Sequence, residues 1–378
     1  MKVLVAGDFC PLNRVAIALE KGLADGVLGK VKPIADAADY AIVNLECPIT
    51  YGSEKRIRKC GPNLHCTEAG VSALRWAGFD CVTLANNHFR DFGDEGVNKT
   101  LGACTKTGLD TVGGGKELQE AGQTLFKNIG NKTLAVINCC EHEFSLATEH
   151  TGGSNPLAPL KQFYAIREAR TRADYVLVVV HGGHEHYQLP STRMQDTYRF
   201  FIDAGADALL NHHQHCYSGY EVYQGKPIFY GLGNFCFDEG MKMNKTWYEG
   251  YMVTIAFDRQ ITFELHPYLQ CKDDATVELV SLNDIESELS SLNEIIADRE
   301  KLVQCVRDYY QSSLHNSNLT LEPITNRYVR ALQHRHLLPK FPFNRKYIVR
   351  LYNFLFCEAH RDKINFFLET EYEKCNKS

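Results

Sequence analysis

The amino-acid sequence predicts an α/β layered domain followed by a helical C-terminal region. Short apolar runs alternate with stretches of helical spacing along the first half of the chain. Glycines close several of the helical stretches, for example Gly78, Gly108 and Gly205. After about residue 275 the strand-like runs stop and helical spacing takes over. We therefore expect a layered domain over residues 1–275 and a helical region over residues 276–378.

The predicted strands of the layered domain are short and apolar. In chain order they cover residues 2–8, 40–46, 81–86, 132–140, 175–181 and 207–213. The predicted helices lie between them, at residues 14–24, 68–78, 95–108, 160–173 and 193–205. This alternation is typical of a domain in which helices cover a sheet. From about residue 221, strand-like segments with short turns predict an antiparallel portion that completes the domain.

The C-terminal region opens with a helix start signal. Ser281, followed by Asp284, resembles a capping box. Apolar residues then follow helical spacing at Leu282, Ile285, Leu289, Leu292 and Ile296. Two more helices are expected, from about Glu322 to Leu338 and from about Arg345 to Tyr372.

One stretch of the C-terminal region is strongly basic. Residues 323–350 carry seven Lys/Arg and no Asp/Glu. A solvated basic face is one interpretation of this stretch. The other is a site for an acidic polymer, a phosphorylated substrate or an anionic membrane surface.

The overall composition excludes several classes of protein. The 378 residues are 44% hydrophobic and 23% charged, with a net charge of -5, so we expect no nucleic-acid partner. No segment approaches the roughly 18 apolar residues of a membrane span. The chain opens directly with a strand instead of a signal peptide, which predicts a cytoplasmic location. The 14 cysteines include no C-x-x-C pair, which favours buried free thiols.

Polar side chains with metal-ligand chemistry follow five of the predicted strands. Ligands of open α/β sheets bind beyond the carboxyl ends of the strands, so these residues are candidates for one site. Taken singly, each histidine would be an ordinary core or surface residue. Taken together, they predict a metal site at one edge of the sheet. The set is Asp8, Glu46, Asn86, Asn87, His88, His181, His212, His213 and His215.

The mixture of carboxylate, amide and imidazole groups indicates which metals the site would hold. Such a set suits one or two divalent ions of Mn, Zn or Fe better than Ca or an iron–sulfur cluster. Two carboxylates, one asparagine and three histidines are enough for two ions with one bridging group. The H-x-H spacing of His213 and His215 lets each imidazole face a different ion.

Six motifs together resemble the CapA-like family of poly-γ-glutamate capsule synthesis proteins, which is related to the calcineurin-like metallophosphoesterases. The resemblance covers about residues 1–260 and implies a four-layer α/β/β/α sandwich with the site at one edge. The motifs are "GD" (residues 7–8), "NLECPIT" (44–50), "GFDCVTLANNHFRDFGDEG" (78–96), "HGGHEHY" (181–187), "DAGADALLNHHQH" (203–215) and "KPIFYGLGNF" (226–235).

The resemblance implies a role for each matching residue. His88 resembles the acid that protonates the leaving group, and Asp91 would orient it. Asn86 is interpreted as a turn residue at the end of its strand. The residues that resemble metal ligands are Asp8, Glu46, Asn87, His181, His213 and His215.

The chain departs from the metallophosphoesterase pattern at two ligands. Those enzymes begin with Asp-x-His, whereas Asp8 is followed by Phe9 and Cys10, so one ligand is missing or replaced. Cys10 is either a thiolate ligand or a buried core thiol. Glu46 stands where those enzymes have a bridging aspartate, which lengthens the side chain by one methylene.

Four polar residues near these motifs have less definite roles. Glu185 is either a substrate contact or a hydrogen-bond partner of a ligand histidine. Asn234, in "GLGNF", is either a substrate contact or part of a tight turn. His184 and His186 are expected at the surface.

Three functions are compatible with the predicted site. The first, which we favour, is hydrolysis of a phosphoester by a metal-activated water in capsule, exopolymer or cell-surface glycan biosynthesis. Its substrate would be an anionic small molecule or polymer intermediate. The second is metal-dependent processing of an amide or γ-glutamyl linkage. The third is a non-catalytic assembly protein that binds poly-γ-glutamate or a capsule polymer.

Overall fold

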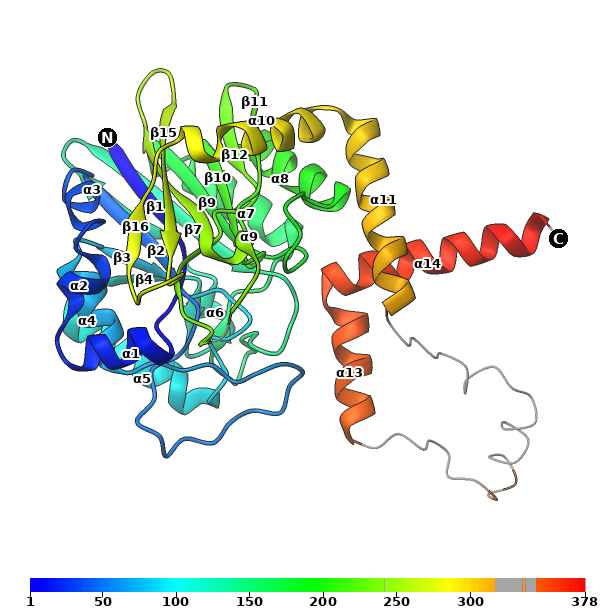
Figure 1. Ribbon diagram of the computed structural model, residues 1–378, viewed down its shortest axis with the longest axis horizontal. Coiled ribbons are helices and arrows are strands. Elements are labelled where there is room, and N and C mark those ends of the chain that lie inside the picture. Colours follow the sequence, from blue (N-terminus) through cyan, green and yellow to red (C-terminus); the bar gives the residue numbers. More distant parts are fainter. Residues whose placement is uncertain (241, 317–334, 336, 338–344, 378) are drawn as a thin grey trace.

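The computed structural model describes residues 1–240, 242–316, 335, 337 and 345–377. Within them lie two large β-sheets, one of eight strands and one of six, and a small two-stranded sheet. Helices flank the sheets, and further helices form a separate group near the C-terminus (Figure 1). The predicted α/β class with C-terminal helices is confirmed.

The eight-stranded sheet contains the first strand of the chain at its centre. Its strands are β1 (Lys2–Cys10), β2 (Tyr40–Leu45), β3 (Cys81–Thr83), β4 (Asp110–Val112), β13 (Asn234–Phe237), β14 (Glu249–Ala256), β15 (Thr262–Gln270) and β16 (Val277–Leu279). Their order is β16-β15-β14-β1-β2-β3-β4, with β13 also paired to β1. Strands β1 to β4 are parallel, and β14 to β16 are antiparallel. The predicted antiparallel portion is therefore found in β14 and β15, whereas β13 pairs in parallel with β1, and β16 lies in the region that was expected to be helical.

The six-stranded sheet has the order β11-β12-β10-β9-β7-β6. Its strands are β6 (Leu125–Ile129), β7 (Lys132–Cys140), β9 (Tyr175–His181), β10 (Ala208–His212), β11 (Tyr220–Tyr223) and β12 (Lys226–Phe229). Strands β7, β9, β10 and β12 are parallel, and the edge strands β6 and β11 are antiparallel to their neighbours. The small sheet pairs β5 (Gly114–Gly115) with β8 (Gly153–Ser154).

The helices fall into three groups along the chain. Those of the N-terminal half are α1 (Asn13–Glu20), α2 (Ala24–Leu28), α3 (Lys32–Asp36), α4 (Glu68–Trp76), α5 (Gly93–Thr107) and α6 (Leu118–Ala121). The middle group is α7 (Pro159–Ala169), α8 (Thr192–Ala204) and α9 (Lys245–Tyr248). The C-terminal group is α10 (Asn283–Ala297), α11 (Arg299–Asn316), α13 (Arg345–Phe356) and α14 (Glu358–Lys377).

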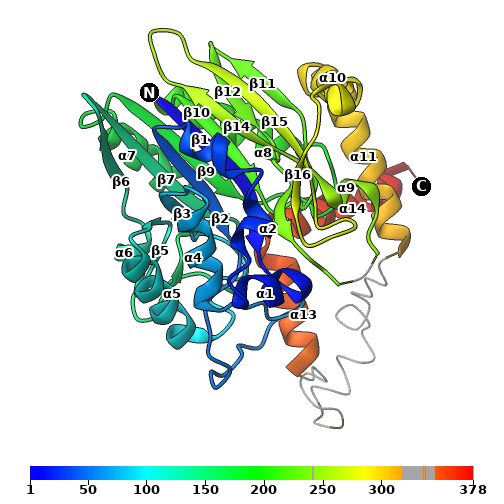
Figure 2. The ribbon, with the colours of Figure 1, turned by 60° about the vertical axis from the view of Figure 1, so that its left-hand side comes forward.

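Two apolar cores establish the order of the layers. Along β1, Val3 and Val5 face the six-stranded sheet, and that core also includes residues of α7 and α8. The alternate residues Leu4 and Ala6 face the second core, with residues of α1, α4 and α5. The sheets therefore pack face to face between two helical layers, the α/β/β/α order that the resemblance implied (Figure 2).

The packing of the two sheets brings their strand ends to one edge. In the eight-stranded sheet, Asp8 pairs in register with Asn44 of the neighbouring strand. In the six-stranded sheet, His181 pairs in register with His212. Because both pairs stand at the carboxyl ends of parallel strands, side chains from the two sheets face one another there.

The C-terminal region agrees with the predicted helical spacing in part. Ile285, Leu289, Leu292 and Ile296 of α10 are buried, as their spacing predicts. The predicted helix from Glu322 to Leu338 and most of the basic stretch lie outside the described residues. The predicted single helix over 345–372 is instead two helices, α13 and α14, which run in different directions from a break at Cys357.

The burial of Cys357 and the contacts of the next residue account for the position of the break between α13 and α14. Cys357 is buried, with its Sγ 3.9 Å from Glu143 Oε1, and the next residue, Glu358, accepts hydrogen bonds from His142. The turn therefore docks the chain against the loop that follows β7.

Within the described residues, no helix is both long and apolar enough to cross a membrane.

A close approach of two backbone segments requires glycine beside the strand ends. A Cβ atom on Gly7 would lie 2.0 Å from the carbonyl oxygen of Gly233, which has a φ of +81°. The amide of Asp8 donates to the same carbonyl oxygen at 3.2 Å. The "GD" and "GLGNF" motifs are therefore two sides of one contact, which sets the position of Asp8.

We expect Gly7→Ala to destabilise the protein by about 1–3 kcal/mol, because the added methyl group overlaps a backbone atom. Gly102→Ala is the control, since a Cβ there meets nothing within 4 Å in helix α5. That change should stabilise the protein by roughly 0.5–1 kcal/mol. Urea denaturation of both variants measures the difference, and equal stability of the two would contradict the proposed close contact.

Candidate metal centre

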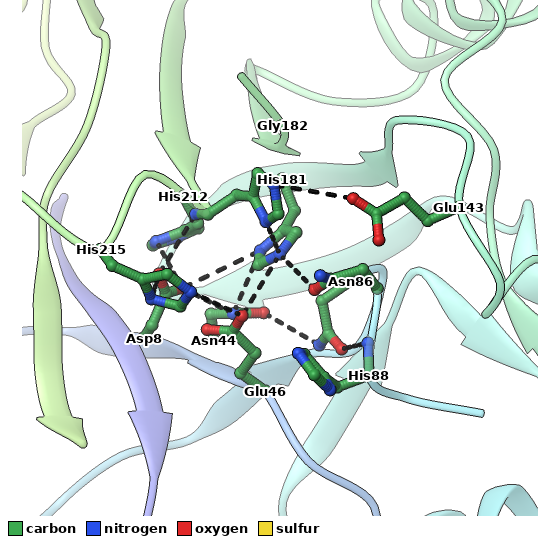
Figure 3. A network of polar contacts seen from close by, with 12 residues as sticks. Asp8, Asn44, Glu46, Asn86, His88, Glu143, His181, Gly182, His212 and His215 are labelled. Atoms are coloured by element: carbon green, nitrogen blue, oxygen red, sulfur yellow. Dashed lines mark hydrogen bonds and ion pairs between the residues drawn. The ribbon is translucent and has the colours of Figure 1, made fainter. Parts of the chain in front are cut away.

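The predicted ligands from the two sheets converge in one buried cluster. Asp8 and Glu46 come from the eight-stranded sheet, whereas His181 and His215 come from the six-stranded sheet and the segment after it (Figure 3). His213 directly follows β10 of the same six-stranded sheet. All five side chains are buried. They form two groups that share Glu46, and the ligand atoms within each group lie within 4.8 Å of one another: Glu46, His181 and His213 in one, and Asp8, Glu46 and His215 in the other.

The first group gathers around the Nε2 atom of His181. Asn87 Oδ1 lies 3.0 Å from this nitrogen, and His213 Nδ1 lies 3.1 Å from it. Glu46 Oε1 is 3.6 Å away. An amide oxygen, two imidazole nitrogens and a carboxylate oxygen therefore face a common point, as the ligands of one metal ion would.

The second group places His215 between the two carboxylates. His215 Nε2 lies 3.8 Å from Glu46 Oε1, and His215 Nδ1 lies 4.0 Å from Asp8 Oδ2. Asn234 is fully buried, and its Oδ1 lies 2.8 Å from His215 Nδ1. This geometry favours a positioning role for Asn234 over the substrate contact that the sequence suggested.

The environment of Glu46 indicates whether the cluster fits a metal ion. Glu46 is fully buried, and neither carboxylate oxygen has a hydrogen-bond partner among the described residues. Burial, and next the charge of Asp8, raises the pKa of Glu46 well above its usual range. Burial, and next His213, lowers the pKa of His181, so this neighbour supplies no compensating positive charge. A divalent cation would satisfy both oxygens, and the donor set fits it.

The structure favours one of the two interpretations of Cys10. The side chain is fully buried and belongs to the apolar core between the eight-stranded sheet and its helices. Burial raises the pKa of this thiol to about 11. Cys10 is therefore best described as a core thiol.

Asn44 supports the cluster from behind, and the sequence did not single it out. Its Nδ2 donates to Asp8 Oδ1 at 2.7 Å, while its Oδ1 accepts from Thr83 Oγ1 at 3.1 Å. The signal available in the sequence was a polar amide within an apolar strand, two residues before Glu46. In the structure this amide is fully buried. The Asn86 side chain donates from Nδ2 to the carbonyl oxygen of Leu45 at 2.8 Å and accepts at Oδ1 from the backbone amide of His88 at 3.1 Å, as expected of a turn residue.

His88 and Asp91 form a buried pair beside Asn87. His88 Nδ1 lies 2.7 Å from Asp91 Oδ2, and the backbone amide of Leu64 also donates to that oxygen, at 2.7 Å. Asp91 is fully buried, so its carboxylate orients the His88 ring as the resemblance implied. Because Nδ1 is held in this way, Nε2 is the ring nitrogen left to exchange a proton with a ligand.

Lys59 contacts both members of this pair, although no motif in the sequence marked its loop as part of the site. Its buried ammonium group pairs with Asp91 and lies 2.9 Å from His88 Nδ1. Burial, and next the positive charge of Lys59, lowers the pKa of His88 to about 4, while Asp91 opposes the shift. The His88 ring is therefore neutral at pH 7 in the metal-free protein.

The backbone is strained where two candidate ligands leave their strand. His213 and His215 have φ values of +90° and +55°, which non-glycine residues rarely adopt. Such conformations cost about 1–3 kcal/mol each and gather at functional sites. The strain follows from directing both imidazoles of the H-x-H segment into the cluster.

A cavity of about 310 Å³ adjoins the cluster. Asn87, His88 and His213 line it, together with Lys59, Glu143 and Glu185. Glu143 Oε1 lies 3.8 Å from His213 Nε2, in a loop where sequence reasoning placed no site residue. Glu185 is exposed in this cavity, where a ligand would meet it.

The two histidines that flank Glu185 have different environments. His186 is exposed, as expected. His184 is buried, with its Nε2 3.0 Å from the hydroxyl of Tyr310, so the expectation of a surface position was wrong. The reason is that helix α11 covers it, which spacing within residues 181–187 does not reveal.

His212 was among the strand-end residues but outside the expected ligand set. It is buried, and its Nδ1 lies 3.5 Å from Asp8 Oδ1. This imidazole is placed to support the Asp8 carboxylate from the six-stranded sheet.

Comparison with known proteins identifies relatives of the layered domain. Residues 2–239 match the family described as "Bacterial capsule synthesis protein PGA_cap". The capsule biosynthesis protein CapA of Bacillus anthracis is 31% identical over 253 residues, covering 65% of this chain and 62% of that protein. The PGA biosynthesis protein CapA of Bacillus subtilis (strain 168) is 34% identical over 239 residues, covering 62% of each. The chain thus spans less than two thirds of the length of these relatives.

Two solved structures show weaker likeness. One is a putative 5'-nucleotidase from Staphylococcus aureus in complex with alpha-ketoglutarate, at 14% identity and a TM-score of 0.42, covering 79% of this chain and 58% of that chain. The other is a hypothetical protein from Thermus thermophilus, at 18% identity and a TM-score of 0.42, covering 71% of this chain and 99% of that chain.

Glu46→Gln should have opposite effects on the metal-free and the metal-loaded protein. Without metal, the variant should be at least as stable as the wild type, because the amide removes repulsion with Asp8. At a Mn²⁺ concentration a hundredfold above its dissociation constant, the wild type should gain about 2.7 kcal/mol, and the variant should lose most of this gain. Thermal denaturation with and without Mn²⁺ measures both effects.

Glu141→Gln is the matched control, since Glu141 is a buried carboxylate that accepts a hydrogen bond from Arg193. It should destabilise the protein and keep the full gain from Mn²⁺. An undiminished gain in the Glu46→Gln variant would contradict the assignment of Glu46 as the shared ligand.

Proposed function

Because this chain belongs to the family of bacterial capsule synthesis proteins, we propose that it is a metal-dependent hydrolase that cleaves a phosphoester in capsule or cell-surface glycan biosynthesis. Its substrate is an anionic small molecule or polymer intermediate, and its location is the cytoplasm. The two groups of ligands that share Glu46 are the observation that carries this proposal.

The shared carboxylate supports a centre with more than one ion. The oxygens of Glu46 are unpartnered among the described residues, and each of the two groups contributes its own histidines to them. When bound, such ions orient and deprotonate a water molecule and stabilise the leaving oxygen. Asn87, His181 and His213 would hold one ion, and Asp8 and His215 the other, with Glu46 between them.

The chain's own residues supply the proton transfer. His88 lines the cavity beside the cluster, and its Nδ1 is held between Asp91 and Lys59. As an imidazolium, a form that the charge of Asp91 favours, the ring would donate Nδ1–H to Asp91 and deliver the proton on Nε2 to the departing oxygen of the substrate. Asp91 is a positioning residue, because it acts on the substrate only through the His88 ring.

Two polar groups of the cavity wall support an anionic substrate, although the wall also carries the carboxylates Glu143 and Glu185. The ammonium group of Lys59 and the imidazole of His88 stand at the cavity wall next to the ligand Asn87. Positively charged groups and hydrogen-bond donors placed near the transferring group are the usual means of stabilising a phosphoryl transition state. A phosphoester therefore suits this wall better than an uncharged amide.

We expect the Mn²⁺-loaded protein to release 4-nitrophenol from 4-nitrophenyl phosphate. His88→Ala should lower kcat by roughly 10²–10⁴-fold, because it removes the proton donor. The bound metal content should stay unchanged, since His88 is not a ligand. His150→Ala removes a histidine from an exposed loop outside the cavity and serves as the control with unchanged kcat.

The same assay separates the competing functions. Release of 4-nitroaniline from γ-glutamyl-4-nitroanilide, without phosphatase activity, would replace the proposal with amide cleavage. Absence of both reactions with Mn²⁺, Zn²⁺ and Fe²⁺ bound would point to a non-catalytic assembly protein.

A further inference from the structure

The C-terminal helices form part of the cavity that adjoins the candidate metal centre. Helices α11 and α14 lie beside each other on one side of the layered domain (Figure 1). Their positions fall beyond residue 239, where the match to the capsule synthesis family ends. The residues that this region contributes to the cavity wall are Tyr309, Asn353, Cys357, Ala359, His360 and Lys363.

The first attachment joins helix α11 to the segment that follows β9. The ring of Tyr309 stacks on Tyr187 with centroids 3.9 Å apart and planes 8° apart. The hydroxyl of Tyr310 lies 3.0 Å from Nε2 of the buried His184. This segment begins at the candidate ligand His181, so α11 is fixed relative to the cluster.

The second attachment joins helix α14 to the loop after β7 and to α8. Glu358 accepts hydrogen bonds from the backbone amide and the Nδ1 atom of His142, at 2.7 and 2.6 Å. Arg193 Nε lies 3.0 Å from both carboxylate oxygens of Asp362, and its Nη2 donates to Glu141 at 2.7 Å. Such buried, charge-assisted contacts define the position of the helix.

Lys363 is the cation that these helices bring to the cavity. Its Nζ donates to the hydroxyl of Tyr309 at 3.0 Å and lies 4.6 Å from the centre of that ring. In the part of the chain that the structure describes, no carboxylate forms an ion pair with it. The other cavity lysine, Lys59, is neutralised by Asp91. Two carboxylates also line the cavity: Glu143, which lies within ion-pair distance of the ligand His213, and Glu185, whose charge acts on His360.

His360 also lines the cavity wall that the C-terminal helices form, and one of its ring nitrogens lacks a hydrogen-bond partner in the described part of the chain. Its Nδ1 is buried and has no hydrogen-bond partner among the described residues. Burial, and next the charge of Lys363, lowers the pKa of His360, which keeps the ring neutral. Because Nδ1 is inaccessible to solvent, a ligand beside Lys363 would meet the His360 ring at another of its atoms.

We propose that α11 and α14 form the far wall of the substrate site, where Lys363, Tyr309 and His360 bind a second anionic group of the substrate. The inference rests on the proposed function, in which a phosphoryl group occupies the metal end of the cavity. The preferred substrate is then a phosphoester with a second anion at the other end. Substrate choice is set by helices outside the family-matched segment.

The test compares two non-hydrolysable probes on the Mn²⁺-loaded full chain. Phenylphosphonate has one anionic end, and 4-carboxyphenylphosphonate has two. Isothermal titration calorimetry should show tighter binding of the second probe to the wild type. Lys363→Met should weaken the second probe about tenfold and leave the first unchanged, as expected for the loss of one charge-assisted contact.

Arg361→Met is the matched control, because it removes one cation from an exposed position on the same helix. It should change neither affinity. Equal affinity of the wild type for the two probes, absence of binding of both, or equal weakening by the two substitutions would each overturn the inference. If 4-nitrophenyl phosphate is not hydrolysed but Lys363 still discriminates between the probes, the proposed hydrolase fails and the anion site stands.

Discussion

The structure depends on one electrostatic constraint, the burial of Glu46 and Asp8 at the meeting edge of two sheets. Both oxygens of Glu46 lack a hydrogen-bond partner among the described residues, and burial raises the pKa of this carboxyl well above its usual range, so its charged form is disfavoured. The neighbouring His181 does not offset this charge, because burial lowers its pKa. A bound cation would remove the conflict, and the histidines stand around the carboxylates even at the expense of backbone strain.

The layered domain and the convergence of the candidate ligands could be predicted from the sequence, because both depend on local patterns along the chain. Apolar runs that end in polar residues mark both the strand and the edge where it stops, so Asp8, His181 and His215 could be named from spacing alone. The glycine motifs likewise reflect a backbone contact between Gly7 and Gly233. Roles for His88 and Asp91 came from the family resemblance, and the buried pair is compatible with them.

Features that depend on distant segments could not be predicted in this way. Lys59 reaches His88 from a loop of ordinary basic composition, and Glu143 reaches His213 from another. His184 is buried only because α11 covers it, and the break at Cys357 reflects docking against another part of the chain. Local spacing carries no information about such contacts, since each is decided by tertiary packing.

We propose that Glu46 is shared between metal ions held at the meeting edge of the two sheets. Anomalous diffraction from crystals of the Mn²⁺-loaded protein tests it most directly. We expect anomalous peaks beside Glu46, one toward Asn87, His181 and His213 and one toward Asp8 and His215. Peaks confined to other parts of the protein, with the Glu46 carboxylate free of metal, would contradict it.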